Sequence, residues 1–281
     1  MFEWWQDALL AATGLLGGTL GGFLGLGGTV VFMPLLKMIS DAGTGTSVGA
    51  HTAVAATLVL NVCVGASSTI GHVRAGRVMP AVVKVIVPTS IIASFGGVML
   101  GDLFKGPAEV WLWRIFGLLI VYVVAMNLYW MVRPRREAEV SEPSPPPAPN
   151  RWLAALTGVL TGLASGLLGV GGGVIAVPSQ QLLLRLPLRA AIANSAVIII
   201  FTCIAAAVVK QIKLASLHGD LATAWLIVAI LAPTAIVGGL VGSHLTHRLP
   251  RTYVRIAFIL FMVWAAYKML TVQAAGAGGA Q

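Results

Sequence analysis

Charged residues are scarce in this sequence, and their scarcity decides the class of protein. Only 10% of the 281 residues are Asp, Glu, Lys or Arg, whereas soluble domains carry about 25%. Hydrophobic residues make up 58%, and apolar stretches of more than about 18 residues, long enough to cross a bilayer, recur along the chain. The sequence therefore predicts an all-α polytopic membrane protein and excludes a soluble domain.

Cysteine and acidic residues are also few. Cys63 and Cys203 lie inside apolar segments, which excludes a disulfide framework and a cysteine-based metal site. The nine acidic residues fall in the terminus, the polar stretches or the segment ends, so no carboxylate is expected at mid-membrane. The apolar segments contain no HExxH motif, carboxylate pair or Ser-His-acid grouping. An enzyme is therefore the least favoured class, no metal or cofactor is expected, and the net charge of +9 is interpreted as membrane orientation instead of nucleic-acid binding.

Glycine, in contrast, is abundant and marks an internal duplication. The stretch 13–34, TGLLGGTLGGFLGLGGTVVFMP, aligns without gaps with 157–178, TGVLTGLASGLLGVGGGVIAVP, and 11 of the 22 positions are identical. Glycines spaced four apart form a stripe in each copy: Gly14, Gly18 and Gly22, then Gly158, Gly162 and Gly166. Such a stripe predicts a helix face along which another backbone approaches closely.

A denser glycine cluster follows each stripe. The clusters contain Gly25, Gly27 and Gly28 in the first copy, and Gly169, Gly171, Gly172 and Gly173 in the second. Because each glycine costs about 1 kcal/mol relative to alanine in a helix, we expect the helix to break here. A new helix should then begin shortly before Pro34 or Pro178, with the proline in its first turn.

Eight apolar segments divide the chain into two halves. They cover 8–39, 47–70, 80–101 and 109–132, and then 152–184, 188–209, 221–244 and 252–272. The proline-rich and charged interval 133–151 is expected to be a flexible linker, and 273–281 a disordered tail. The chain is thus predicted to contain one transmembrane repeat in 1–132 and a second in 152–272.

The segments 8–39 and 152–184 are too long for one simple crossing. About 32 helical residues span roughly 48 Å, against a hydrocarbon core of about 30 Å. Either each is a single tilted pass, or each folds back as a hairpin at its glycine cluster. Single passes divide the lysines and arginines 10 to 8 between the two sides, whereas hairpins divide them 12 to 6. We therefore favour hairpins, with a cytoplasmic linker, both termini outside the cell (inner) membrane, and two halves of inverted orientation, as in many secondary transporters.

The helix starts at the two glycine clusters form the predicted anion site. Freed backbone N–H groups, with the positive end of the helix dipole behind them, bind an anion without a charged side chain. The candidate substrate-binding residues are Gly27, Gly28, Thr29, His51, Thr52, Gly171, Gly172, Gly173, Asn194 and Ser195. The pairs His51-Thr52 and Asn194-Ser195 occupy matched positions in 47–70 and 188–209, from which their side chains could reach the clusters.

Simpler interpretations stay open for these residues. The glycines could serve close packing alone, and the polar side chains could form ordinary interhelical hydrogen bonds. Asn61, near the middle of 47–70, is interpreted as such a packing hydrogen bond. Beside two positive helix ends, His51 is expected to stay neutral, so His51→Asn should keep the pH profile of transport.

Several motifs recur in both halves or stand beside the glycine stretches. They are the duplicated G-x3-G-x3-G-x2-G-x-G-G pattern ending in Pro34 and Pro178, Ala50-His51-Thr52 and Ala193-Asn194-Ser195, Arg74-Ala75-Gly76-Arg77-Val78, Gly97-x3-Gly101 and Gly238-x3-Gly242. In these motifs the sequence resembles the TauE/SafE sulfite exporter family, over nearly the whole chain except the linker and the tail. Thr29 and His51, which stand where the second half has Gly173 and Asn194, depart from the repeated pattern and leave the particular anion open.

The resemblance implies export or uptake of a small sulfur-containing anion such as sulfite or an organosulfonate. Because a duplicated, helix-broken fold suits alternating access, we expect a secondary transporter, with export as the favoured direction. A passive anion channel is the alternative, and counterflow-capable, saturable flux would argue against it. The expected partners are the substrate anion and the lipid bilayer, without nucleic acid, and the oligomeric state is left open.

Overall fold

The computed structural model of the chain describes residues 4–41, 48–132, 150–216, 220–246 and 251–271. Those residues form α-helices joined by short turns, with one turn of 3-10 helix, η1. The helices are α1 (Trp4–Leu24), α2 (Thr29–Asp41), α3 (Ala50–Arg74), α4 (Pro80–Gly101), α5 (Glu109–Val132), α6 (Arg151–Leu168), α7 (Gly173–Leu182), α8 (Leu188–Ser216), α9 (Leu221–Leu245) and α10 (Arg251–Leu270); η1 is Gly106–Ala108. Within the described ranges, α3, α4, α5, α6, α8 and α9 are long and apolar enough to cross a membrane. The all-helical membrane fold is confirmed, while the tail and most of the linker lie outside the described residues.

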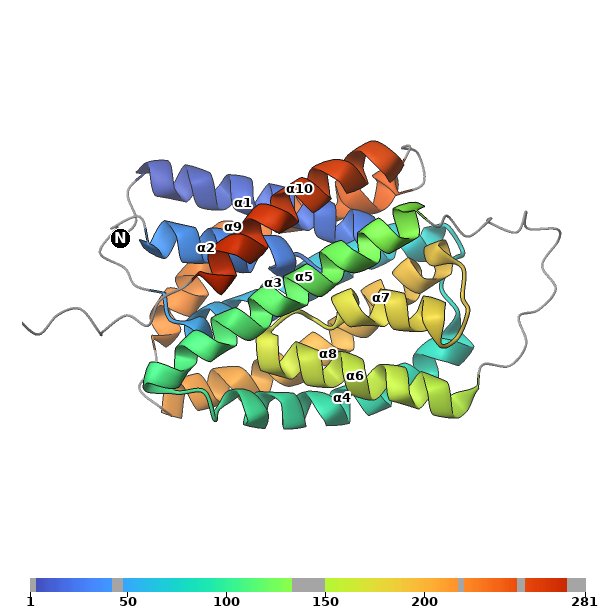
Figure 1. The fold of residues 1–281 in the computed structure, drawn as a ribbon, viewed down its shortest axis with the longest axis horizontal. Coiled ribbons are helices and arrows are strands. Elements are labelled where there is room, and N and C mark those ends of the chain that lie inside the picture. Colours follow the sequence, from blue (N-terminus) through green and yellow to red (C-terminus); the bar gives the residue numbers. More distant parts are fainter. Residues whose placement is uncertain (1–3, 42–47, 133–149, 217–219, 247–250, 272–281) are drawn as a thin grey trace, which may run out of the picture.

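Both long segments break at their glycine clusters and fold back. Gly27 has a φ of +75° and Gly172 a φ of +76°, in the left-handed region that glycine adopts without a steric penalty. After the first break the chain returns along α1, because the ring of Phe32 in α2 lies against Gly17 in α1. Figure 1 shows α1 and α2 running in opposite directions, and α6 and α7 likewise. The hairpins predicted from the glycine clusters are therefore present.

The prolines lie one turn later than expected. Pro34 and Pro178 are inside α2 and α7, not in the first turn. The reason is that each helix begins directly at the glycine cluster: the Gly28 carbonyl accepts hydrogen bonds from the N–H groups of Val31 and Phe32, both at 2.9 Å. A proline in the second turn removes one amide donor from the helix. Each of these short helices thus lacks one internal hydrogen bond near its start.

Each glycine stripe packs against a helix of the other half. In α1, a Cβ on Gly18 would lie 2.3 Å from the carbonyl oxygen of Ala235 in α9. In α6, a Cβ on Gly162 would lie 2.1 Å from the carbonyl oxygen of Ser90 in α4. The stripes therefore serve close backbone packing, as predicted, and α1–α9 and α6–α4 are matched pairs that join the halves.

The glycine stripe should be intolerant of even one methyl group. We expect Gly162→Ala to lower thermal stability, because overpacking a tight contact costs about 1–3 kcal/mol. Gly96→Ala, in α4, is the matched control, since the nearest atom to its added Cβ is a Leu163 methyl at 3.6 Å. Thermal unfolding of the two purified variants checks this, and an equal melting temperature would show that the stripe is not tightly packed.

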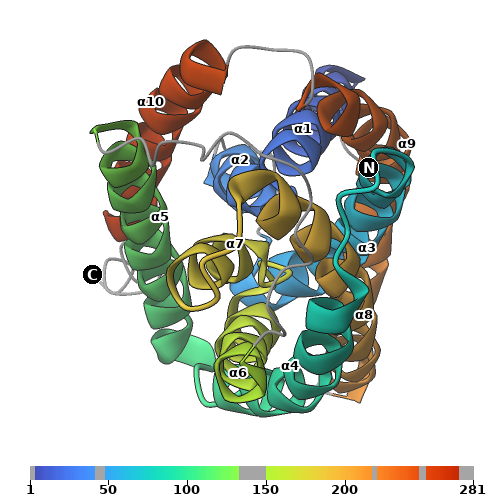
Figure 2. The same cartoon turned by 90° about the vertical axis from the view of Figure 1, so that its right-hand side faces the viewer.

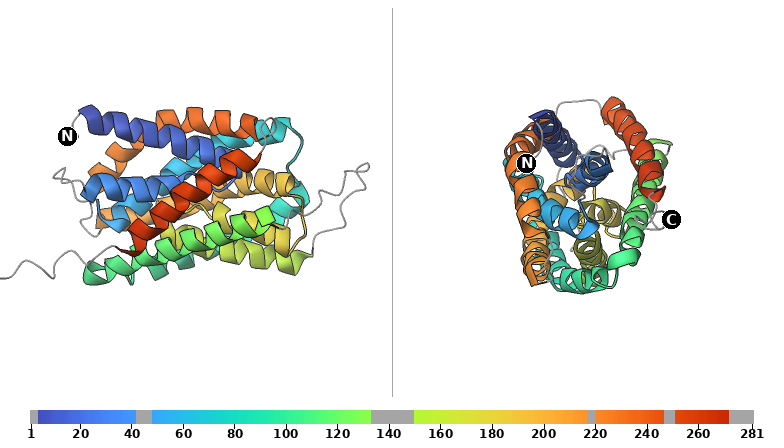
Figure 3. Two further views of the ribbon diagram at one scale, coloured as in Figure 1. Left: turned by 45° about the horizontal axis from the view of Figure 1, so that its top comes forward. Right: turned by 90° about the vertical axis from the view of Figure 1, so that its left-hand side faces the viewer.

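The helices α3 and α8 hold the centre of the molecule together. They pack against each other and run in opposite directions along the long axis of the bundle (Figure 1). Seen end-on, α2 and α7 lie in the middle, surrounded by the long helices (Figure 2). The helices α5 and α10 pack together along one flank (Figure 3). The two hairpin tips are therefore placed in the interior of the bundle.

The helix α8 is longer than its apolar segment. It was expected to end near residue 209, but it continues to Ser216 and so includes Lys210 and Lys213. Its last turns tolerate these charges because both ammonium groups pair with the carboxylate of Asp102, directly after α4. A hydropathy profile ends the segment at the first lysine, because it takes no account of a carboxylate from another part of the chain that pairs with the lysine.

Candidate functional site

The two helix breaks meet at the centre of the bundle. The Thr29 hydroxyl, at the start of α2, donates a hydrogen bond of 2.8 Å to the carbonyl of Gly169 in the other break. From the second half to the first, the Ser195 hydroxyl of α8 donates a hydrogen bond of 2.7 Å to the carbonyl of Gly25. A Cβ on Gly173 would lie 2.6 Å from that same Gly25 oxygen. The starts of α2 and α7 therefore converge from opposite halves, as the duplicated clusters predict.

Asn61 in α3 bridges the two breaks. Its Oδ1 accepts a hydrogen bond of 2.9 Å from the N–H of Gly28. Its Nδ2 donates one hydrogen bond of 3.1 Å to the carbonyl of Gly169 and another to the Thr29 hydroxyl. The side chain is completely buried. The interhelical hydrogen bond predicted for Asn61 is therefore present, but the sequence prediction did not place it between the two breaks. The available signal was its chemistry: a lone amide in an apolar segment is expensive to bury and often marks a functional position.

The polar groups around the breaks favour an anion over a cation. The carbonyls of Gly25 and Gly169, which could ligate a cation, already accept hydrogen bonds from side chains. The Gly28 N–H, at the positive end of α2, is capped by a neutral amide oxygen from Asn61. An incoming oxyanion could replace that oxygen at the same N–H and would gain more from the helix dipole than a neutral amide does.

The four predicted side-chain ligands take different positions. Ser195 contacts the break, as expected. The Asn194 amide instead accepts a hydrogen bond of 2.7 Å from the Met79 N–H and donates one of 3.0 Å to the Gln180 side chain. His51 contacts the Phe104 carbonyl and Lys210, and since it is ten residues before Asn61 it lies about 15 Å away along α3. Thr52 is buried beside it, at the same end of α3. His51 and Asn194 are thus turned away from the breaks.

The structural register of the repeat explains this difference. Ile192 and Ser195, the fifth and eighth residues of α8, contact Gly25. Val54 and Thr57, the fifth and eighth residues of α3, lie against Gly169 in the same way. The equivalent of Ser195 is therefore Thr57. Local sequence similarity had matched Ser195 to Thr52. That alignment is shifted along α3, relative to the structural one, by five residues, which is more than one helical turn.

Comparison with known proteins finds a family model and several relatives that match this chain. The family model described as "Sulfite exporter TauE/SafE" matches residues 10–269. The chain is 26% identical over 268 residues to the probable membrane transporter protein YunE of Bacillus subtilis, covering 91% of this chain and 94% of YunE. It is 38% identical over 129 residues to the probable membrane transporter protein MamO of Magnetospirillum gryphiswaldense, which covers 45% of this chain and 20% of MamO. No solved structure matches the chain.

Proposed function

Because the chain belongs to the TauE/SafE sulfite exporter family, whose curated relatives here are probable membrane transporters, we propose that it exports a small sulfur-containing anion such as sulfite or an organosulfonate. The proposed site lies where the two helix breaks meet. It consists of Gly27, Gly28, Thr29, Gly171, Gly172, Gly173 and Ser195 from the sequence prediction, with Asn61 added. His51, Thr52 and Asn194 are left out of the proposed anion site because of where their side chains lie.

The observation that carries this proposal is the cap that Asn61 places on Gly28. Sulfite and sulfonate groups present three oxygens, so they need several donors from more than one direction. Two convergent helix starts and the donor side chains of Thr29, Asn61 and Ser195 supply these directions. The anion would take the place of the Asn61 oxygen at the Gly28 N–H. The Asn61 amide would then turn and exchange one of its hydrogen bonds, to Thr29 or to Gly169, for one to the anion.

An inverted arrangement of the two halves, which we propose, would support a transport cycle of alternating access. The helices α3 and α8 point in opposite directions, and each half contributes one broken hairpin that ends at mid-bundle (Figure 1). In an inverted repeat the two halves exchange conformations, which opens the same central site to one side and then to the other. The cross-half pairs α1–α9 and α6–α4 would then move as rigid units.

Anion flux through purified protein tests the function. We would reconstitute the full chain in liposomes and compare sulfite, thiosulfate, sulfoacetate and taurine as substrates. A transporter gives saturable uptake that is accelerated by the same anion inside the vesicle, because the loaded site returns faster than the empty one. Flux that is linear in concentration and shows no counterflow would favour the passive channel. No uptake of any of these anions, by protein that remains folded, would contradict the proposed substrate class.

The distribution of basic residues predicts which end of the bundle faces the cytoplasm. We expect a cysteine at Lys105 to be labelled by an impermeant maleimide from outside, and a cysteine at Arg77 only after the membrane is opened. Both parent residues are exposed and lie in turns between helices. The background lacks Cys63 and Cys203. Labelling of both positions from outside, or the reverse pattern, would contradict the predicted orientation.

A further inference from the structure

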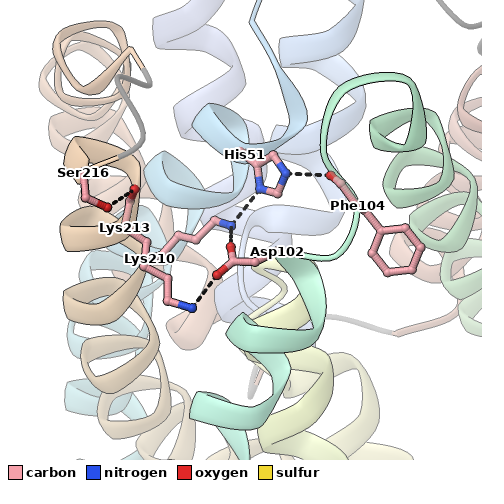
Figure 4. Close-up of polar contacts among 6 residues, drawn as sticks. All are labelled: His51, Asp102, Phe104, Lys210, Lys213 and Ser216. Atoms are coloured by element: carbon pink, nitrogen blue, oxygen red, sulfur yellow. Dashed lines mark hydrogen bonds and ion pairs between the residues drawn. The ribbon is translucent and has the colours of Figure 1, made fainter.

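A cluster of acidic and basic groups lies at one end of α3 and α8, away from the anion site. Figure 4 shows its members: His51 at the start of α3, Asp102 directly after α4, and Lys210 and Lys213 in the last turns of α8. Lys210 Nζ lies 2.8 Å from His51 Nδ1 and 3.4 Å from Asp102 Oδ1. The Lys210 side chain is only 4% exposed and that of Asp102 13%. Burial of this kind requires close pairing, since an unpaired charge is strongly disfavoured.

The hydrogen bonds fix where the proton of His51 resides. The Phe104 carbonyl can only accept, so His51 Nε2, at 2.8 Å from it, carries the proton. Nδ1 is therefore the lone pair that accepts from the Lys210 ammonium. A proton added to Nδ1 would set two N–H donors against each other. His51 can gain a proton only if its contact with Lys210 breaks.

The surrounding charges favour the neutral imidazole in the observed arrangement. Around the pair of His51 and Lys210 are Lys213 from α8, Asp102 and Lys105 from the turn after α4, and Glu109 from α5, whose carboxylate accepts a hydrogen bond from the Ala50 N–H. With Lys210 itself, these make five charged groups. The formal charges of these five groups add up to +1, and a charged imidazole would raise the total charge to +2. Burial opposes ionisation of Asp102, but the hydrogen bond from Lys213 and the charge of Lys210 outweigh it, so the pKa of Asp102 lies below its usual value.

The acidic member of the cluster has no counterpart at the equivalent position of the repeat. Lys210 is the twenty-third residue of α8, and the twenty-third residue of α3 is His72. The Gly97–Gly238 match pairs Asp102 with Ser243, which lies against Gly71, the residue before His72. One end of the bundle thus has Lys and Asp where the other has His and Ser. This asymmetry within a duplicated fold indicates a function that one side of the membrane requires.

We propose that His51, Lys210 and Asp102 form a proton-binding site that couples proton movement to anion transport. The proposal rests on the proposed transport function and adds its coupling ion. A proton from water forms the Nδ1–H bond of His51, the hydrogen bond from Lys210 to Nδ1 breaks, and Lys210 stays paired with Asp102. Because that hydrogen bond joins α3 to α8, proton binding loosens the two helices that bring Asn61 and Ser195 to the anion site.

Coupled flux in liposomes is the first test. The full-length protein is reconstituted with pyranine inside, and methanesulfonate, which stays ionised across the pH range, is the probe. We expect a proton gradient to drive methanesulfonate accumulation in the wild type. His51→Asn and Lys210→Met should reduce this accumulation by about tenfold or more, within the usual range of coupling between sites, while keeping exchange of internal for external methanesulfonate. Lys84→Met is the matched control, because Lys84 is exposed on α4 and lies eighteen residues before Asp102, outside the cluster.

The outcomes separate a failure of coupling from a failure of the transport proposal. Equal gradient-driven accumulation in wild type and His51→Asn would overturn the proton site. A raised KM in Lys210→Met with intact coupling would make Lys210 an anion-recruiting residue instead. If no methanesulfonate moves at all, the substrate class fails, and the proton site is then judged by nitrogen NMR of His51. We expect His51 to take up its proton at a higher pH in Lys210→Met than in the wild type; identical titrations would refute the linkage without any substrate.

Discussion

Asn61→Asp is expected to abolish anion binding while leaving the protein folded. The carboxylate has almost the shape of the carboxamide, and one of its oxygens accepts the Gly28 N–H hydrogen bond more strongly, because a charged acceptor suits a helix start. The other oxygen no longer donates to the Gly169 carbonyl, which keeps its hydrogen bond from the Thr29 hydroxyl, so we expect some loss of stability without unfolding. The variant therefore carries an internal anion in the place proposed for the substrate. Like charges in one buried site cost several kcal/mol, so we expect affinity to fall by about 100-fold or more. Equilibrium binding of radiolabelled sulfite or taurine to detergent-purified protein measures the loss.

Asn194→Asp is the control for this experiment. It introduces the same charge at another fully buried asparagine, whose amide contacts Met79 and Gln180. We expect its effect on affinity to be less than about one tenth of that of Asn61→Asp, because field effects weaken with distance and only Asn61 touches both breaks. Equal losses in the two variants would place the anion elsewhere, and normal binding by Asn61→Asp would do the same.

Exchanging the two residues that differ at the helix starts should give very unequal results. Gly173→Thr, which copies Thr29, is expected to unfold the centre of the bundle, because its Cβ would lie 2.6 Å from the Gly25 oxygen and 2.7 Å from a methyl of Ile199. Backbone contacts cannot relax as a flexible side chain does, so we expect a loss above about 3 kcal/mol. Thermal unfolding in detergent and the yield of monodisperse protein report the effect.

The reciprocal change, Thr29→Gly, should be far milder. It removes the hydroxyl that donates to Gly169, while Asn61 still donates to the same carbonyl. Together with the lower helix propensity of glycine, we expect a loss of about 1–2 kcal/mol. A Thr29→Gly variant less stable than Gly173→Thr would mean that the two breaks do not touch as described.

The sequence predicts the hairpins, the stripes and the meeting of the two breaks because these depend on backbone freedom. Glycine adopts a positive φ such as that of Gly27 without steric strain, and it alone leaves room for a carbonyl 2.1 Å from a would-be Cβ at Gly162, so its pattern encodes those features directly. The partner of each stripe was not predictable, since a bare helix face fits any close backbone. That α1 pairs with α9, and not with its own half, emerges only in three dimensions.

Side-chain roles were harder to predict, for a reason that His51 and Asn61 illustrate. The matched motifs Ala50-His51-Thr52 and Ala193-Asn194-Ser195 suggest one register, while the contacts of Thr57 and Ser195 establish another. A shift of more than one turn moves a side chain by several ångströms along the helix, which separates a ligand from its site. The prediction that His51 is neutral agrees with its contacts in the observed arrangement, but the group beside it is Lys210 and not the start of α2 or α7. The further prediction that His51→Asn keeps the pH profile of transport conflicts with the proton site proposed above, and the coupled-flux experiment decides between them.

Gly172 shows a related limit. From sequence, a large side chain there would simply obstruct the anion. In the structure its φ is +76°, and an added Cβ would lie 2.3 Å from a methyl and 2.7 Å from the carbonyl oxygen of Thr161 in α6. Substitution would therefore strain the hairpin itself. Loss of binding in such a variant would not distinguish a missing ligand site from a misfolded one, which is why Asn61 is the better position to change.

The pairing of each glycine stripe with the opposite half sets the order in which the chain can mature during synthesis. Gly14 contacts Leu231 in α9, so roughly 200 residues must emerge before the first hairpin meets its partner, about 10–40 s at ordinary rates of translation. Until then the bare face of α1 is open to lipid, to the insertion machinery or to another nascent chain. The second hairpin, in contrast, finds α4 already in the bilayer when α6 arrives. The N-terminal glycine stripe therefore stays without its partner helix for longer than the second stripe does. During that time it is more accessible to the quality-control machinery of the cell.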